Sequence, residues 1–247
     1  MKLLVCISKA PDTTAKITFK DNNTAFNTDG VQFIINPYDE WYALVRALEI
    51  KESLGNGSVT VINAGPADND PIIRKALAIG ADDAVRINME ATDALSIAEE
   101  IANYAKQESY DMILTGKETI DYNGSQLAGM IAELLEWPSV SLASHMDISG
   151  STATIERDVQ GGKEVVEVST PFVLSAAKGM AEARIPNMRG IMAARTKPLK
   201  VVEVSSSNTY TKVNSYTLPP EKAECKYIDA ENPAELFDLL RNEAKVL

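Results

Sequence analysis

Short apolar runs alternate with amphipathic helical segments through more than half of this chain. The apolar runs cover residues 2–7, 58–63, 85–87, 112–115 and 140–145, and the helical segments between them begin near Pro37, Pro71, Ala94 and Leu127. Short connections between such elements make right-handed βαβ units, whose strands pair in parallel. The alternation therefore predicts an α/β fold: an open, mostly parallel twisted sheet with helices on both faces, of the Rossmann-like nucleotide-binding kind.

Turn residues divide the rest of the chain. The run Asp21-Asn22-Asn23 predicts a hairpin between residues 17–19 and 24–26, and Gln160-Gly161-Gly162 predicts an antiparallel hairpin between residues 152–158 and 164–169. Residues 172–176 read as a further strand. Asn36 is a suitable N-cap for the first long helix, with Pro37 at its first position and Gly55 at its end.

The last part of the chain differs in composition. Residues 201–229 are polar and contain proline, and residues 233–245 predict one final amphipathic helix. We therefore expect an α/β domain over residues 1–195 and an extended C-terminal arm over residues 196–247. Such an arm either clasps a partner chain or packs on its own domain.

Bulk composition excludes several classes of protein. The net charge of −11 argues against nucleic acid or anionic membranes as main partners, and no run of 18 apolar residues predicts membrane insertion. The two cysteines, Cys6 and Cys225, are too few for a disulfide framework and too far apart for a metal site. We expect Cys6 to be buried in the first strand. We expect the protein to lie in the cytoplasm or in an organelle matrix.

Ligands of an open parallel sheet bind beyond the carboxyl ends of its strands. Residues 8–12, 36–39, 64–66 and 116–126 are expected at that edge. The last segment suggests a phosphate site, because a helix begins near Gly124 and its first N–H groups attract anions. The alternative is a helix start that Asn123 or Ser125 caps. Neither a GxGxxG nor a GxxxxGK[ST] motif is present, which disfavours a dinucleotide or Walker-type site.

Catalytic groups are not evident. Glu118, Asp121 and Glu133 have no spacing that requires acid–base work, and the only histidine, His145, lies in an apolar run that predicts a packed side chain. Lys9 and Lys117 could meet a phosphate or face solvent. We therefore predict binding without turnover, with no catalytic residue and no metal.

The segment of residues 183–202 contains no Asp or Glu, although the chain is acidic. We call it the acid-free segment. It holds Arg184, Arg189, Arg195, Lys197 and Lys200 together with Ile185, Met188, Ile191 and Met192. Basic and apolar residues on a segment interrupted by proline and glycine suit a surface that grips another protein. The alternative is a surface loop whose methionines fold back into the core.

Several separated motifs in this order resemble a known family, the small (β) subunit of the electron-transferring flavoprotein. They are R-D-x-x-G-G-x-E at residues 157–164, the Pro171-Phe172-Val173 strand, the run of residues 183–195 ending in I-M-x-A-R, the D-G-V…N-P-Y-D-E run of residues 29–40, G-K-x-x-I-D…Q at residues 116–126, and L-x-W-P at residues 135–138. The resemblance covers essentially the full chain.

The resemblance implies a heterodimer with a large α subunit that holds most of one FAD, while the β subunit holds a buried AMP. It also implies a carrier that moves electrons from acyl-CoA and related dehydrogenases to a quinone oxidoreductase, in the bacterial cytoplasm or the mitochondrial matrix. Carried over residue by residue, the AMP contacts fall on Cys6, Asn36, Pro37, Tyr38, Asp39, Ala64, Asp121, Asn123, Gly124, Ser125, Gln126, Leu127 and Met130.

The resemblance also places a dehydrogenase-docking loop at residues 183–195. Its contacts fall on Arg184, Ile185, Pro186, Met188, Arg189, Ile191, Met192 and Arg195, with Met188 where familiar members have an anchoring leucine. Thr13 stands where a tyrosine of some members approaches the flavin. The D-G-D-T-A-Q-V run of electron-bifurcating members is absent, which favours AMP over a second FAD. A bifurcating relative and a stand-alone nucleotide-binding regulator are the two alternatives.

Overall fold

The structure is a computed structural model that describes residues 1–91, 93–205, 208–222 and 224–247. Contacts between Cα atoms divide the chain into two units. The larger unit comprises Met1–Ile17 and Asn27–Asn214, and the smaller comprises Thr18–Phe26 and Ser215–Leu247.

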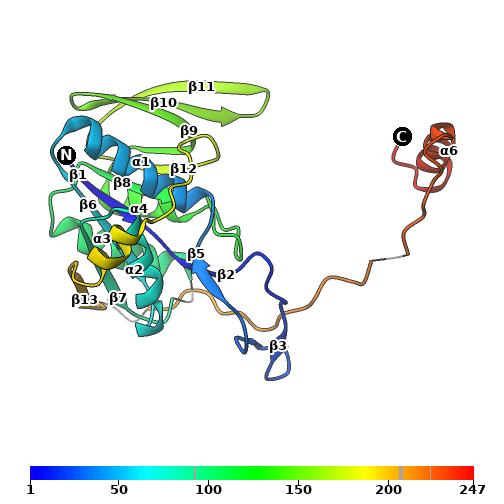
Figure 1. The fold of residues 1–247 in the computed structure, drawn as a ribbon, viewed down its shortest axis with the longest axis horizontal. Helices are drawn as coiled ribbons and strands as arrows, with labels where there is room; N and C mark the ends of the chain where they lie inside the picture. The colour runs from blue at the N-terminus through cyan, green and yellow to red at the C-terminus, as the bar shows by residue number, and fades with distance from the viewer. Residues whose placement is uncertain (92, 206–207, 223) are drawn as a thin grey trace. The chain divides into compact units, whose positions relative to one another are not determined.

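A nine-stranded sheet forms the centre of the larger unit, counted over the described residues (Figure 1). In spatial order its strands are β11 (Gly162–Ser169), β10 (Thr152–Val159), β9 (Ser139–Ser149), β12 (Phe172–Ala176), β8 (Met112–Gly116), β1 (Lys2–Cys6), β6 (Ser58–Ala64), β7 (Asp83–Asn88) and β13 (Leu199–Glu203). From β9 to β13 all neighbours are parallel. The predicted open, mostly parallel sheet is confirmed.

Helices cover both faces of this sheet. One core lies between the sheet and the helices α1 (Asp39–Leu54) and α2 (Asp70–Ile79), and the other lies under α3 (Ala94–Lys106) and α4 (Leu127–Leu135). Successive β1 residues alternate between them, since Leu3 and Val5 join the first core and Leu4 and Cys6 the second. A strand buried on both faces must be apolar throughout, which explains the continuous run at the N-terminus.

The antiparallel hairpin is confirmed at one edge of the sheet. Strand β10 pairs with β11 from Thr152↔Ser169 to Val159↔Gly162, so the strands run slightly further toward the turn than predicted. Figure 1 shows this hairpin, in yellow-green, as the last two strands of the sheet. Only one of its faces is covered by the α1-side core, because Ala153 and Ile155 are buried there while Val165 is exposed.

Five elements differ from the prediction. The first long helix begins at Asp39 instead of Pro37, because Tyr38 has a φ of 65° and Asn36 is buried in other contacts. A short helix, α5 (Met188–Ala194), forms inside the expected docking loop. Strand β13 lies just beyond it and pairs with β7, although its range falls within the expected arm. Two short strands, β2 (Lys9–Pro11) and β5 (Phe33–Ile35), also pair antiparallel.

The smaller unit contains the predicted hairpin of β3 (Phe19–Lys20) and β4 (Ala25–Phe26). The ring of Tyr216 stacks on Phe19 with centroids 4.8 Å apart, and its backbone N–H donates to the Asn23 carbonyl. The predicted terminal helix is present as α6 (Pro233–Asp238), followed by a π-helical turn, η2 (Leu239–Glu243). Among all described residues, no helix combines the length and apolarity needed to cross a membrane.

Candidate functional site

The carboxyl ends of β1, β6 and β8 meet at one edge of the sheet, beside the starts of α1 and α4. The segments that the sequence singled out there are the turn after β6, residues 36–39 before α1, and residues 116–126 between β8 and α4. Long-range hydrogen bonds join the last two of these segments, and another ties the end of β6 to Ile7, just beyond β1.

Asn36 connects the start of α1 with the loop before α4. Its side chain is completely buried. The amide Nδ2 donates to the Glu118 carbonyl at 3.1 Å, and Oδ1 accepts from the Ile120 N–H at 3.0 Å. Sequence analysis expected Asn36 to cap its own helix, but α1 has no side-chain cap. Its amide is instead hydrogen-bonded to Glu118, 82 residues further along the chain. Asn36 therefore fixes the loop before α4.

A cavity of about 550 Å³ opens between these two segments. Its lining consists of Pro37, Tyr38, Asp39, Tyr42, Lys117, Glu118, Ile120, Asn123 and Lys178. Four of the residues expected to bind a nucleotide, Pro37, Tyr38, Asp39 and Asn123, therefore share one cavity. Sequence reasoning missed Tyr42 and Lys178, because neither belongs to a recognisable motif.

Two lysines give the cavity positive charge. Lys117 lies 2.9 Å from Glu118 Oε1 and 4.0 Å from Asp39 Oδ2. The hydrogen bond to Glu118 raises the pKa of Lys117, so the ammonium group stays charged. Desolvation raises the pKa of Asp39, and the Lys117 charge opposes that shift. The cavity thus presents the cationic Lys117 beside Asp39, a carboxyl group of reduced acidity, and this arrangement suits an anionic ligand.

The start of α4 lacks a side-chain cap. Its N-cap is Gln126, whose side chain makes no capping hydrogen bond, so the expectation that Asn123 or Ser125 caps this helix is wrong. Both residues are exposed and have positive φ angles, 49° for Asn123 and 54° for Ser125. A capping residue usually has an extended backbone instead. The first N–H groups of a helix need partners. Here no side chain of the helix start supplies one.

Four expected nucleotide contacts belong to the other face of the sheet. Cys6 is buried in the core under α3 and α4, and Ala64, Leu127 and Met130 are half-buried against that core. Burial raises the pKa of the Cys6 thiol far above its usual value, so it stays protonated and packs as expected. The remaining expected contacts, Asp121, Gly124, Ser125 and Gln126, are exposed on the loop between the two groups.

The turn after β6 is fixed by two asparagines. Asn63 Nδ2 donates to the Ile7 carbonyl at 2.9 Å, and Asn69 Nδ2 donates to Asn63 Oδ1 at 2.9 Å. A Cβ atom at Gly65 would lie 2.0 Å from Asn69 Nδ2, so only glycine fits. This network holds Ala64 at the strand end.

Glu40 is a buried residue near this edge that the sequence did not single out as part of the site. Its carboxyl accepts from the Ser8 N–H at 2.7 Å and from the Ser8 hydroxyl at 2.8 Å. Desolvation raises the pKa of Glu40 to about 8, although the Ser8 bonds oppose the shift. A Cβ atom at Gly116 would lie 2.7 Å from the Glu40 backbone N, which explains a glycine at the end of β8.

Two further predictions concern single residues. Thr13 is exposed on a turn that Asp12 organises by accepting from the N–H and hydroxyl of Thr14 at 2.9 and 2.6 Å. The prediction that His145 is packed is wrong. Its side chain is exposed, and its Nε2 atom lies 3.1 Å from Asp147 Oδ2. Strand β9 is covered on one face only at this point, and His145 points to the other face.

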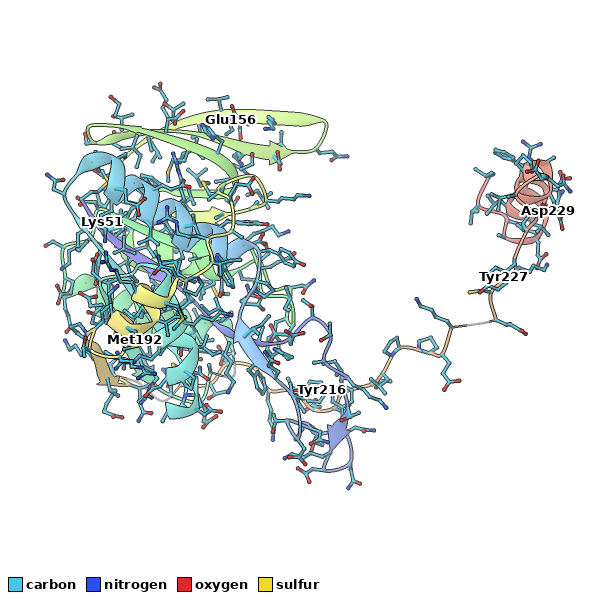
Figure 2. The ribbon with its side chains drawn as sticks, viewed as in Figure 1. Lys51, Glu156, Met192, Tyr216, Tyr227 and Asp229 are labelled. Atoms are coloured by element: carbon cyan, nitrogen blue, oxygen red, sulfur yellow. The ribbon has the colours of Figure 1, made fainter. Side chains whose placement is uncertain are left out.

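The expected docking loop (residues 183–195) is an exposed, ordered surface. The exposed fractions are 85% for Ile185, 73% for Met188, 57% for Met192 and 40% for Ile191. The alternative, in which the methionines return to the core, is therefore wrong. Figure 2 labels Met192 on α5, the short yellow helix. Arg189 and Arg195 are also exposed, and Pro186 is half-buried.

No group of three or more His, Cys, Asp or Glu side chains in the described part of the chain could hold a metal ion. The cavity at the sheet edge is lined by two lysines, Lys117 and Lys178, by the carboxyl groups of Asp39 and Glu118, and by polar and apolar side chains.

Comparisons with known proteins give one consistent result. The model of the Electron transfer flavoprotein domain matches residues 23–207. Electron transfer flavoprotein subunit beta of Bacillus subtilis is 36% identical over 261 aligned residues, with all of both chains covered. The subunit beta of Syntrophomonas wolfei is 36% identical, covering 100% of this chain and 98% of its own. The human subunit beta is 32% identical over 208 residues, covering 82% and 81%.

Proposed function

The chain belongs to the electron transfer flavoprotein family as a beta subunit, and on that premise we propose that it binds AMP and completes a heterodimeric electron carrier. Its partner is the alpha subunit, which holds most of the FAD. The heterodimer takes electrons from acyl-CoA and related dehydrogenases and delivers them to a quinone oxidoreductase. This chain contributes binding surfaces and carries out no turnover of its own.

The uncapped start of α4 is the observation that carries the AMP proposal. The helix dipole and the N–H groups of the first turn attract an anion there, and no side chain of the helix start competes for them. Gly124 leaves the approach open, because a Cβ built on it meets only Gln126 Nε2, at 3.8 Å. The negative charge of a phosphate group suits this position.

The rest of the nucleotide extends from this phosphate position along the strand ends. The polar loop of Asp121, Asn123, Ser125 and Gln126 and the half-buried Ala64, Leu127 and Met130 offer it polar and apolar contacts. Pro37, Tyr38 and Asp39 form the opposite wall. Asn36 and Cys6, being buried, support these walls from behind.

FAD, when bound, supplies the redox chemistry of the heterodimer. The part of this chain proposed to lie near the FAD is the exposed turn that carries Thr13. Threonine has no aromatic face on which a flavin ring could stack, so the turn would shape the partner's flavin pocket without holding the ring.

The docking loop is the proposed contact with the dehydrogenase. Met188 is the apolar anchor, since an unbranched thioether adapts to differently shaped pockets. Ile185, Ile191 and Met192 extend the apolar surface, and Arg189 and Arg195 form a basic rim that favours an acidic partner. The C-terminal arm, which includes the exposed Phe237, clasps the alpha subunit.

The AMP proposal is tested by the nucleotide content of Gly124 variants of the heterodimer. Gly124→Asp places a carboxylate where the phosphate approaches, and we expect the affinity for AMP to fall about 10-fold or more. Gly124→Asn has nearly the same size without the charge and should retain most of the AMP. Acid extraction and chromatography measure the bound nucleotide.

Two outcomes of this extraction contradict the proposal. Wild-type protein that releases no nucleotide has no AMP site of this kind. Wild-type protein that releases two FAD molecules per heterodimer belongs with the electron-bifurcating members instead.

A further inference from the structure

The docking loop exposes large apolar side chains from a helix of seven residues. An isolated helix of this length is not stable in water. Something outside α5 must therefore keep it folded while Met188 and Met192 face solvent. The contacts at the two ends of the docking loop identify the residues that keep α5 folded.

Two residues of α1 hold the upstream end. The Glu52 carboxylate binds the Arg184 guanidinium in a bidentate pair, at 2.7 Å to Nη1 and 3.0 Å to Nη2. Trp41 Nε1–H donates to the Arg184 carbonyl at 3.2 Å. Planar bidentate geometry fixes direction as well as distance. Arg184 is thus tied by its side chain and its backbone to the same helix.

Residues of α2 hold the rest of the loop. Arg74 Nη1 donates to the carbonyls of Ala194 and Lys197, at 2.9 and 2.6 Å. Gly190 faces the end of α2 so closely that a Cβ atom on it would lie 2.3 Å from the Ala78 carbonyl oxygen. The Asn187 side chain caps α5 by accepting from the Gly190 N–H at 2.8 Å.

We propose that Trp41, Glu52 and Arg74 are positioning residues for dehydrogenase docking, and that Arg184 tethers the loop to Trp41 and Glu52 rather than contacting the partner. This inference rests on the proposed function of the docking loop. We call the four residues the α1–α2 clamp. None of the first three belongs to the acid-free segment.

The clamp acts by ordering the loop before the partner arrives. A segment that is already seated loses less conformational entropy on binding, so its complex is tighter for the same contacts. The side chain of Glu52 is about half-exposed, and an exposed ion pair adds little to folding stability. Loss of the clamp should therefore weaken docking while hardly changing the melting temperature.

The test compares Glu52→Ala with Glu49→Ala in the assembled heterodimer. Both variants remove one acidic charge from α1, but Glu49 pairs with Arg46 on its own helix, at 3.0 Å. Electron transfer from an acyl-CoA dehydrogenase is measured as a function of dehydrogenase concentration. We expect Glu52→Ala to raise the half-saturating concentration about 5-fold or more, with the saturating rate unchanged, and Glu49→Ala to leave both parameters within about 2-fold.

Hydrogen exchange of the α5 amides gives a second readout that needs no dehydrogenase. Exchange at residues 188–194 should become faster in Glu52→Ala and not in Glu49→Ala. Trp41→Phe, which replaces the indole by a smaller aromatic ring without an N–H, should shift docking in the same direction by a smaller factor.

Met188→Ala in the same assay separates this inference from the function on which it rests. If Met188→Ala impairs transfer and Glu52→Ala behaves like Glu49→Ala, the clamp is wrong and the docking loop stands. If neither Met188→Ala nor Glu52→Ala changes transfer, the docking function itself is wrong. A Glu52→Ala heterodimer that melts several degrees lower at an unchanged half-saturating concentration shows a purely structural role, which also overturns the clamp.

Discussion

Glu40 shows how one buried carboxyl can connect the start of a helix with the end of a strand. It lies at the start of α1, yet its partner is Ser8, just beyond β1. Asp39 and Asp121 carry like charges nearby and raise its pKa further, in addition to the larger effect of burial. At neutral pH the group is mostly protonated in the folded protein and ionised in the unfolded chain.

The raised pKa gives Glu40 a defined effect on stability. The folded state binds one more proton than the unfolded state between pH 4.5, the ordinary value, and about 8. Its contribution therefore falls as pH rises through that window, by up to about 1.4 kcal/mol per pH unit. We expect Glu40→Gln to melt higher than the wild type at pH 8, and the difference to shrink toward pH 5.

Melting curves of the two proteins at pH 5, 6, 7 and 8 measure this difference. The matched control is Glu49→Gln on the same helix, whose carboxylate is half-buried and paired with Arg46. A difference that stays constant over the range would show that Glu40 does not change its protonation there.

Met188 is the residue on which docking should depend most. A buried anchor at an interface centre contributes about 2 kcal/mol or more, and about 1.4 kcal/mol is a factor of ten. Met188→Ala should therefore slow electron transfer from the dehydrogenase about 10-fold or more. Its melting temperature and AMP content should hardly change, because the side chain is 73% exposed.

The control for Met188→Ala is Val201→Ala, which truncates another exposed apolar side chain of the acid-free segment outside the docking loop. Added salt should weaken docking of the wild type, because the arginine rim is exposed to solvent. A Met188→Ala protein that transfers electrons normally but melts several degrees lower would place the side chain in the core and refute the docking role.

At the scale of elements, α5 depends on the surface of α2. The two helices pack tightly at Gly190, where an added Cβ atom would lie 2.3 Å from the Ala78 carbonyl oxygen. We expect Gly190→Ala to push α5 away from Ala78 and to destabilise the protein by about 1–3 kcal/mol, the usual cost of overpacking. Thermal melting of the heterodimer measures the effect.

Gly129 provides the matched control for Gly190→Ala. It lies inside α4, and a Cβ built on it meets no atom within 4 Å. Gly129→Ala should stabilise the protein by up to about 1 kcal/mol, since alanine favours a helix. Equal melting shifts for the two alanines would show that α5 does not sit against α2 as described.

At the scale of the whole molecule, the proposed function requires one nucleotide site and several partner surfaces from this chain. It has no dinucleotide fingerprint, and Thr13 has no aromatic ring. We therefore expect the chain produced without the alpha subunit to lack the visible absorbance of flavin, while the co-produced heterodimer is yellow. The matched control is the alpha subunit produced alone. Stoichiometric FAD on the solitary beta chain would refute the assignment of AMP to its site.

The sequence by itself determined that the chain forms an open, mostly parallel sheet covered by helices. The alternation of apolar runs and amphipathic helices indicates which surfaces must be buried. Residues 2–7 are apolar on both sides, and the structure buries both sides. The same local reasoning failed for His145, since an apolar run does not reveal that one face of β9 lies open. It also missed α5, whose seven residues are too few to show a helical period.

Only the tertiary structure decided which distant residues meet. Asn36 and Ile120, Ser8 and Glu40, and Glu52 and Arg184 are separated by 84, 32 and 132 residues. Periodicity records which face of an element is apolar and says nothing of which other segment lies against it. The polar contacts that shape the nucleotide edge and seat the docking loop arise from the packing of helices on the sheet. For that reason the sequence can propose candidate sites, but it does not reveal the distant residues that hold them in place.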